Sequence, residues 1–129
     1  MLAQEHAQTA LDYLEKADQY FAEGDLLQAS EKLWGAAAHA VLSVATERGW
    51  RDASHRALTE AAESLAEEVN NPLIASNFST ARLYHRNFYH GFMEPEEWLT
   101  DRPKIHYFVA RVLALRGDAG QNGQPGDAI

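Results

Sequence analysis

The residues best suited to chemistry in this chain gather in one short segment, Ala81 to Phe92, which reads ARLYHRNFYHGF. The guanidinium group of arginine can hold a phosphate by two parallel hydrogen bonds, and the imidazole of histidine exchanges protons near neutral pH. If the segment is helical, Arg82, Arg86 and His90 stack at i, i+4 and i+8 on one side. This spacing predicts a groove that holds a phosphate between two guanidinium groups, with an imidazole in reach for proton transfer.

The same segment lies in a stretch without acidic residues. The chain of 129 residues has 19 Asp and Glu against 11 Lys and Arg, a formal net charge of −8, yet no Asp or Glu occurs from Val69 through Met93. The overall charge argues against indiscriminate coating of nucleic acids but allows a local anion site. We therefore expect a nucleotide or an RNA phosphate to bind here. The predicted ligand-binding residues are Arg82, Arg86, Asn87, Tyr89 and His90.

Plainer interpretations of these residues remain open. Arg82 and Arg86 can be solvated or paired with the many surface acids. On a helical wheel, His85 falls inside the apolar stripe of its segment, so it can be a hydrogen-bonded core residue.

A metal site is not predicted from the six histidines. His85 and His90 are five residues apart, which does not place them on one helical face as an i, i+4 pair would be. His39 falls on the polar side of its helix and is expected to be solvated, and His6 and His55 have no partner at ligand spacing. We predict no metal and no cofactor. The chain has no cysteine, so disulfides and thiolate chemistry are excluded.

The elements that must position these residues are helices. Apolar residues recur at three- and four-residue steps in segments at about 3–23, 26–48, 54–70, 72–90 and 95–116, and Gly24, Gly49 and Asn70-Asn71-Pro72 separate the earlier ones. In the last segment, Pro103 predicts a break near Thr100-Asp101 because it lacks an N–H. No stretch alternates as a strand does. We predict an all-α, up-and-down bundle of four or five helices at residues 1–116 and a disordered, glycine-rich tail at 117–129.

Two apolar lines carry further expectations. In the fourth helix, Ile74, Phe78, Ala81, Phe88 and Phe92 form one stripe, which predicts that this side is buried. In the first helix, Leu2, Tyr13 and Tyr20 fall opposite the main stripe. Exposed apolar lines usually mark contacts, so this second line predicts a homodimer.

The combination resembles a known family. The residues that carry the likeness are YLEKADQYFAEGDLLQASEKLWGAAAHAV, RGW, SHRAL and NFYHGFMEPEEW, within about residues 7 to 115, and they look like the PaREP-type branch of the HEPN superfamily. The resemblance implies a bundle that often dimerises. In HEPN ribonucleases, an Arg supports the RNA phosphate and a His acts as acid–base, without metal. Here only three residues separate Arg86 from His90, a shorter interval than the family pattern.

Three functions follow as hypotheses. The first is a dimerising HEPN-like module that binds a nucleotide, RNA or a partner protein without catalysis. The second is a metal-independent endoribonuclease of a toxin–antitoxin system, with Arg86 and His90 catalytic and a nucleotidyltransferase-like partner protein. The third is a structural helical adaptor that uses Tyr13 and Tyr20. The sequence shows no signal peptide and no membrane-spanning run, so we expect a cytoplasmic location.

Overall fold

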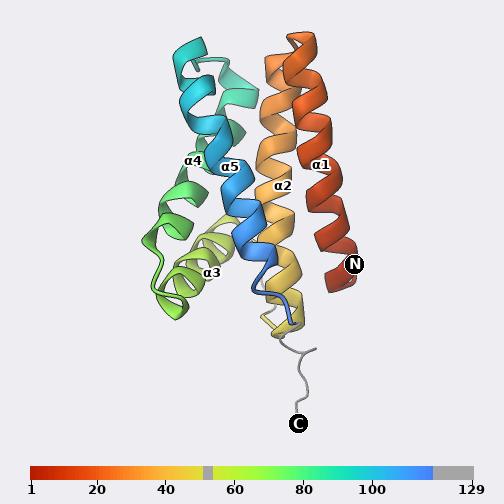
Figure 1. The fold of residues 1–129 in the computed structure, drawn as a ribbon, viewed down its shortest axis with the longest axis vertical. Helices are drawn as coiled ribbons and strands as arrows, with labels where there is room; N and C mark the ends of the chain where they lie inside the picture. The colour runs from red at the N-terminus through yellow and green to blue at the C-terminus, as the bar shows by residue number, and fades with distance from the viewer. Residues whose placement is uncertain (51–53, 118–129) are drawn as a thin grey trace.

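The computed structural model describes residues 1–50 and 54–117. Its helices are α1 (Ala3–Glu23), α2 (Leu26–Glu47), α3 (His55–Glu68), α4 (Pro72–His90) and α5 (Pro95–Leu113). The long helices run alternately up and down, and the shorter α3 lies obliquely between the end of α2 and the start of α4 (Figure 1). No strand occurs among the described residues, so the predicted all-α bundle is confirmed there. The predicted disordered tail falls, from residue 118 on, outside the described residues.

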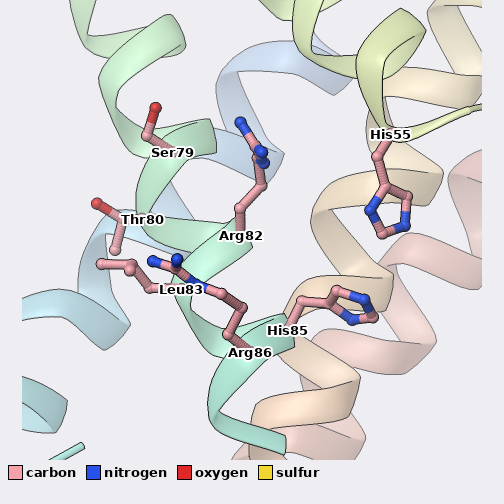
Figure 2. Close-up of a pocket in the computed structure, with 7 residues that line it drawn as sticks. All are labelled: His55, Ser79, Thr80, Arg82, Leu83, His85 and Arg86. Atoms are coloured by element: carbon pink, nitrogen blue, oxygen red, sulfur yellow. The ribbon is translucent and has the colours of Figure 1, made fainter. Parts of the chain in front are cut away.

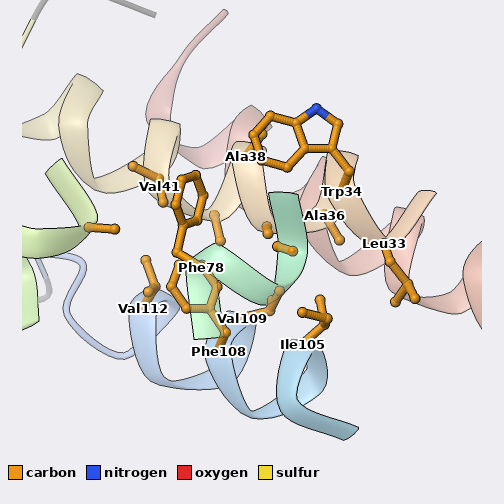
Figure 3. Packing of buried hydrophobic residues seen from close by; sticks show 14 of the residues in the cluster. Leu33, Trp34, Ala36, Ala38, Val41, Phe78, Ile105, Phe108, Val109 and Val112 are labelled. Carbon is orange, nitrogen blue, oxygen red and sulfur yellow. The ribbon is translucent and has the colours of Figure 1, made fainter. Parts of the chain in front are cut away.

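Helix α2 is the centre of the bundle, because it packs against each of the other four helices. Alanines fill much of its surface, and side chains this small let neighbouring helices approach closely. Leu33, Val41 and Val44 of this helix are fully buried. Phe78 of α4 and Phe108 of α5 complete the core, with ring centroids 5.5 Å apart (Figure 3). The candidate site on α4 is therefore supported by a core that α2 organises.

The helix ends follow local signals. Gly24 has a φ of 83°, the left-handed conformation that favours glycine, and it ends α1. The Asp25 side chain then accepts a hydrogen bond from the Gln28 N–H at 3.2 Å and caps α2. Asn71 caps α4 in the same way, with Pro72 in its first turn. These turns confirm the boundaries predicted between the first and second helices and before the fourth.

Helix α5 corrects the predicted break near Thr100-Asp101, because it runs without interruption across Pro103. The missing N–H of Pro103 leaves only the carbonyl of Leu99 without its helical partner. Both residues are exposed, so water can reach that carbonyl and the ring faces no packed neighbour. On the other side of the helix, Ile105 and Phe108 are fully buried. This burial holds the helix together through the proline.

Helix α4 also differs from its predicted stripe. Ile74, Phe78 and Ala81 are buried as expected, whereas Phe88 is half-buried and Phe92 is 44% exposed. Beyond Ala81 the interior side of α4 is instead occupied by two side chains with polar groups, Tyr84 and Asn87. A pattern built from apolar residues alone could not assign them inward. Because the buried side turns toward these two residues, the side that carries the arginines faces outward.

The second apolar line of α1 is not the exposed surface that was predicted to dimerise. Tyr13 and Tyr20 are half-buried and pack against the core. The Tyr13 ring lies on α2, with the Lys32 ammonium 4.3 Å from its centroid and the His39 ring at 5.5 Å. Only Leu2 of the line is strongly exposed, at 69%. The expectation that Tyr13 and Tyr20 are exposed was wrong, because α2 is buried on several sides and covers this face of α1 too.

The contact between Tyr13 and Gly35 gives a first testable prediction. A Cβ at Gly35 would lie 2.6 Å from Cδ2 and 2.9 Å from Cε2 of Tyr13, so the ring must move. Alanine gains about 1 kcal/mol of helix propensity over glycine, but overpacking of this kind costs about 1–3 kcal/mol. We expect Gly35→Ala to lower the free energy of unfolding in urea by about 1–2 kcal/mol.

The matched control places Gly35→Ala in a Tyr13→Ala background. There the new methyl group meets no ring, so the substitution should be neutral or stabilising by up to about 1 kcal/mol. An increase in stability in the wild-type background would show that the helices do not approach as closely as described.

Candidate functional site

A groove of about 530 Å³ lies between the start of α3 and the outer side of α4 (Figure 2). Its volume falls within the range of about 300–1,000 Å³ that is usual for small-molecule sites. No described residue that lines it is acidic. The residues that line it are His55, Ser79, Thr80, Arg82, Leu83, His85 and Arg86.

The two groove arginines, Arg82 and Arg86, are exposed, and within residues 1–50 and 54–117 neither pairs with a carboxylate. Most other described arginines do pair. The pairs are Arg48 with Glu68, Arg56 with Glu60, Arg102 with Asp18 and Arg116 with Glu47. In a chain rich in acid, the two cations of the groove are thus left available to an external anion.

The arginine side chains do not form the clamp predicted for a single phosphate. In Figure 2 the Arg86 side chain extends along α4 past Leu83, whereas the Arg82 side chain points away from Leu83. The two guanidinium groups therefore lie apart. They are placed to contact separate anionic groups, as on a chain of phosphates.

Two histidines complete the groove, and only one of them lies in the segment first singled out. The rings of His55 on α3 and His85 on α4 meet edge to face, with centroids 4.9 Å apart. Both contact the Trp34 ring of α2, at 5.0 Å and 5.1 Å. His85 is half-buried rather than a core residue, and His55 is exposed. No sequence signal could have paired them, because the packing of α3 on α4 brings them together.

Burial lowers the pKa of His85 below its ordinary value, and the neighbouring His55 lowers that pKa further. The imidazole of His85 is therefore neutral near pH 7. Neither the His55 ring nor the His85 ring hydrogen-bonds to another described residue, so their ring nitrogens are available to a ligand. The groove thus combines two permanent cations with two imidazole rings.

The remaining predicted site residues are placed differently. Tyr89 is 67% exposed and borders the groove through an edge contact with the His85 ring, at 5.4 Å. Asn87 is 2% exposed and faces the interior, where it donates to Ser30 Oγ at 2.8 Å and accepts from the Met93 N–H at 2.8 Å. His90, the last residue of α4, is exposed and does not line the groove.

The other histidines have partners outside the groove. His6 Nδ1 and His39 Nδ1 lie 2.9 Å apart and join α1 to α2. The expectation that His39 is merely solvated is therefore wrong: it is half-buried, and burial lowers its pKa. His106 Nε2 lies 3.0 Å from an Asp18 oxygen. Within the described residues, no three His, Asp or Glu side chains gather as a metal site would require.

No helix among the described residues is both long and apolar enough to cross a membrane.

Comparison with known proteins gives one family and one fold. The model of the archaeal PaREP1/PaREP8 family matches residues 5–109. A crystal structure of a protein from Sulfolobus solfataricus is similar, with a TM-score of 0.72 and 22% sequence identity. The alignment covers 82% of this chain and 94% of that one, and at this identity it shows a shared fold alone. No curated protein matches the chain.

Proposed function

The chain belongs to the archaeal PaREP1/PaREP8 family, and from this premise we propose that it is a HEPN-like binding module for phosphate-bearing ligands. Its groove between α3 and α4 takes the phosphates of single-stranded RNA or of a nucleotide. The observation that carries the proposal is the pair Arg82 and Arg86. Among the described residues, they share a groove without acidic lining residues and have no carboxylate partner.

Local charge favours this ligand although the chain as a whole is acidic. At about 0.15 M salt the Debye length is about 8 Å, so distant carboxylates act weakly on a bound phosphate. Arg82 and Arg86 are in direct reach of the groove, and charge-assisted hydrogen bonds from guanidinium to phosphate are strong ones. Since the two guanidinium groups lie apart (Figure 2), a ligand with several phosphates uses both. This favours RNA, or a nucleotide with several phosphates, over a ligand with a single phosphate.

We propose binding without turnover. In the ribonuclease alternative, Arg86 and His90 act together, but His90 does not line the groove that holds Arg86. Catalysis by these two residues therefore depends on a second copy of the chain, as the resemblance to HEPN ribonucleases implies. The homodimer and the nucleotidyltransferase-like partner both stay predictions.

The test is the affinity for a labelled single-stranded RNA, measured by fluorescence anisotropy. We expect Arg86→Ala to weaken binding by about 5- to 100-fold, equivalent to about 1–3 kcal/mol, because a guanidinium–phosphate contact is lost. The dependence of log K on log salt should also become shallower by about 0.7, the share of one phosphate contact on a single strand.

Arg111→Ala is the matched control, because Arg111 lies near the end of α5, does not line the groove and has no carboxylate partner among the described residues. It should leave the affinity for RNA within about twofold of wild type. Equal losses in both variants would mean that binding is diffuse, and no binding by wild type would favour the adaptor hypothesis. Cleavage of the RNA that disappears in His90→Ala would favour the ribonuclease.

A further inference from the structure

We propose that His55 and His85 make the groove proton-coupled: binding of an RNA backbone adds a proton to this histidine pair, so that affinity rises as the pH falls. The inference rests on the proposed function, because it concerns the same groove. It adds residues that the arginine pattern did not include and a regulation that the arginines alone cannot provide, since guanidinium stays charged throughout.

The geometry supplies the first argument. His55 and His85 come from different helices, and their ring centroids are 4.9 Å apart. Both residues line the groove together with Arg82 and Arg86. In Figure 2 the two imidazoles face each other across the space between α3 and α4. Their nitrogens have no hydrogen-bond partner in the described part of the chain, whereas those of His6, His39 and His106 do. The groove histidines therefore have unused donor positions.

The surroundings of His85 explain why its pKa is low in the free protein. From α2 it meets the Trp34 ring, from α3 it meets His55, and on α4 it has Tyr89, Arg82 and Arg86 nearby. No described lining residue is a carboxylate that would hold a proton on it. Burial and the adjacent imidazole lower its pKa, and a second positive charge beside His55 is disfavoured.

A phosphodiester in the groove reverses this balance. Its negative charge stabilises imidazolium, and each protonated ring offers an N–H to a phosphate oxygen. The pKa of His85 is then higher in the complex than in the free protein, so binding takes up a proton from solvent. By linkage, uptake of one proton strengthens binding about tenfold for each pH unit between the free and bound pKa values.

The probe must not titrate by itself. A terminal phosphate has a second pKa near about 6, which would add its own proton to the measurement. We therefore choose a uridine oligomer without terminal phosphates, whose phosphodiesters stay singly charged. Affinity is measured from about pH 8 to about pH 5.5, across the ordinary histidine range, with the full chain. Calorimetry at about pH 6.5 in two buffers of different ionisation enthalpy counts the protons taken up.

We expect wild type to bind at least about tenfold more tightly at the acidic end and to take up between about 0.5 and 1 proton. His85→Gln should lose most of that uptake and most of the pH dependence of the affinity. His55→Gln, at an exposed position, tests the pair without removing a half-buried ring. His106→Gln is the control, since His106 lies between α1 and α5, and it should behave as wild type.

The outcomes separate the two proposals. If wild type binds the oligomer equally well at all pH values and takes up no proton, the inference is overturned while the proposed function stands. The inference is equally overturned if both His85→Gln and His55→Gln keep the wild-type pH dependence. If wild type binds the oligomer at no pH, the proposed function fails and the inference fails with it.

Discussion

Replacing Phe78 with alanine is expected to lower the free energy of unfolding by about 3–5 kcal/mol, the usual cost of deleting a buried aromatic side chain. Phe78 is 1% exposed and lies where α2, α4 and α5 meet. Its ring contacts Trp34 at 5.6 Å and Phe108 at 5.5 Å (Figure 3). The three helices cannot all move inward to fill the cavity that the missing ring leaves, because they also pack against one another along the rest of their length. Urea unfolding followed by circular dichroism measures the loss.

The control for Phe78→Ala is Leu73→Ala, five residues earlier on the same helix. Leu73 is 52% exposed, so its truncation should cost less than about 1 kcal/mol. Phe78→Ala is also expected to affect the groove, because the Trp34 ring that contacts Phe78 also contacts the rings of His55 and His85. Equal, small losses in the two variants would mean that Phe78 does not join the three helices.

Replacing Asn87 with leucine is expected to cost about 2–4 kcal/mol, because two buried polar groups lose their partners at about 1–3 kcal/mol each. The Met93 N–H can only donate, so the amide oxygen of Asn87 must face it. This leaves the NH₂ group to donate to Ser30 Oγ. The side chain thereby ties the turn after α4 to α2. Thermal or urea unfolding of the variant gives the loss.

Two controls identify the source of that loss. Adding Ser30→Ala to Asn87→Leu removes one of the two polar groups that the leucine leaves without a partner. The double variant should therefore lose less unfolding free energy than the sum of the two single losses. The folded fraction of Asn87→Leu should keep wild-type affinity for RNA, unlike Arg86→Ala. If Asn87→Leu had unchanged stability but reduced affinity for RNA, Asn87 would be a ligand-binding residue, as predicted from the sequence.

The sequence alone determined the local geometry of this protein. Gly24 with Asp25, and Asn71 with Pro72, predict turns and caps whose hydrogen bonds span only a few residues, and they occur as expected. The position of Arg82 and Arg86 on one side of α4 is equally local, because helical spacing alone sets it. Pro103 shows the limit of such rules. Its local cost is one helical hydrogen bond, and the burial of the opposite side of α5 outweighs that cost.

Only the tertiary structure decided which side chains meet across helices. It places Tyr84 and Asn87 in the interior and packs α2 against Tyr13. Among the described residues, it also leaves the groove arginines without a carboxylate partner, whereas Arg102 pairs with Asp18. It also joined His55 to His85 on the Trp34 ring. The physical reason is that backbone hydrogen bonds define a helix within a few residues, whereas the rotation of one helix against another depends on the core that all of them share.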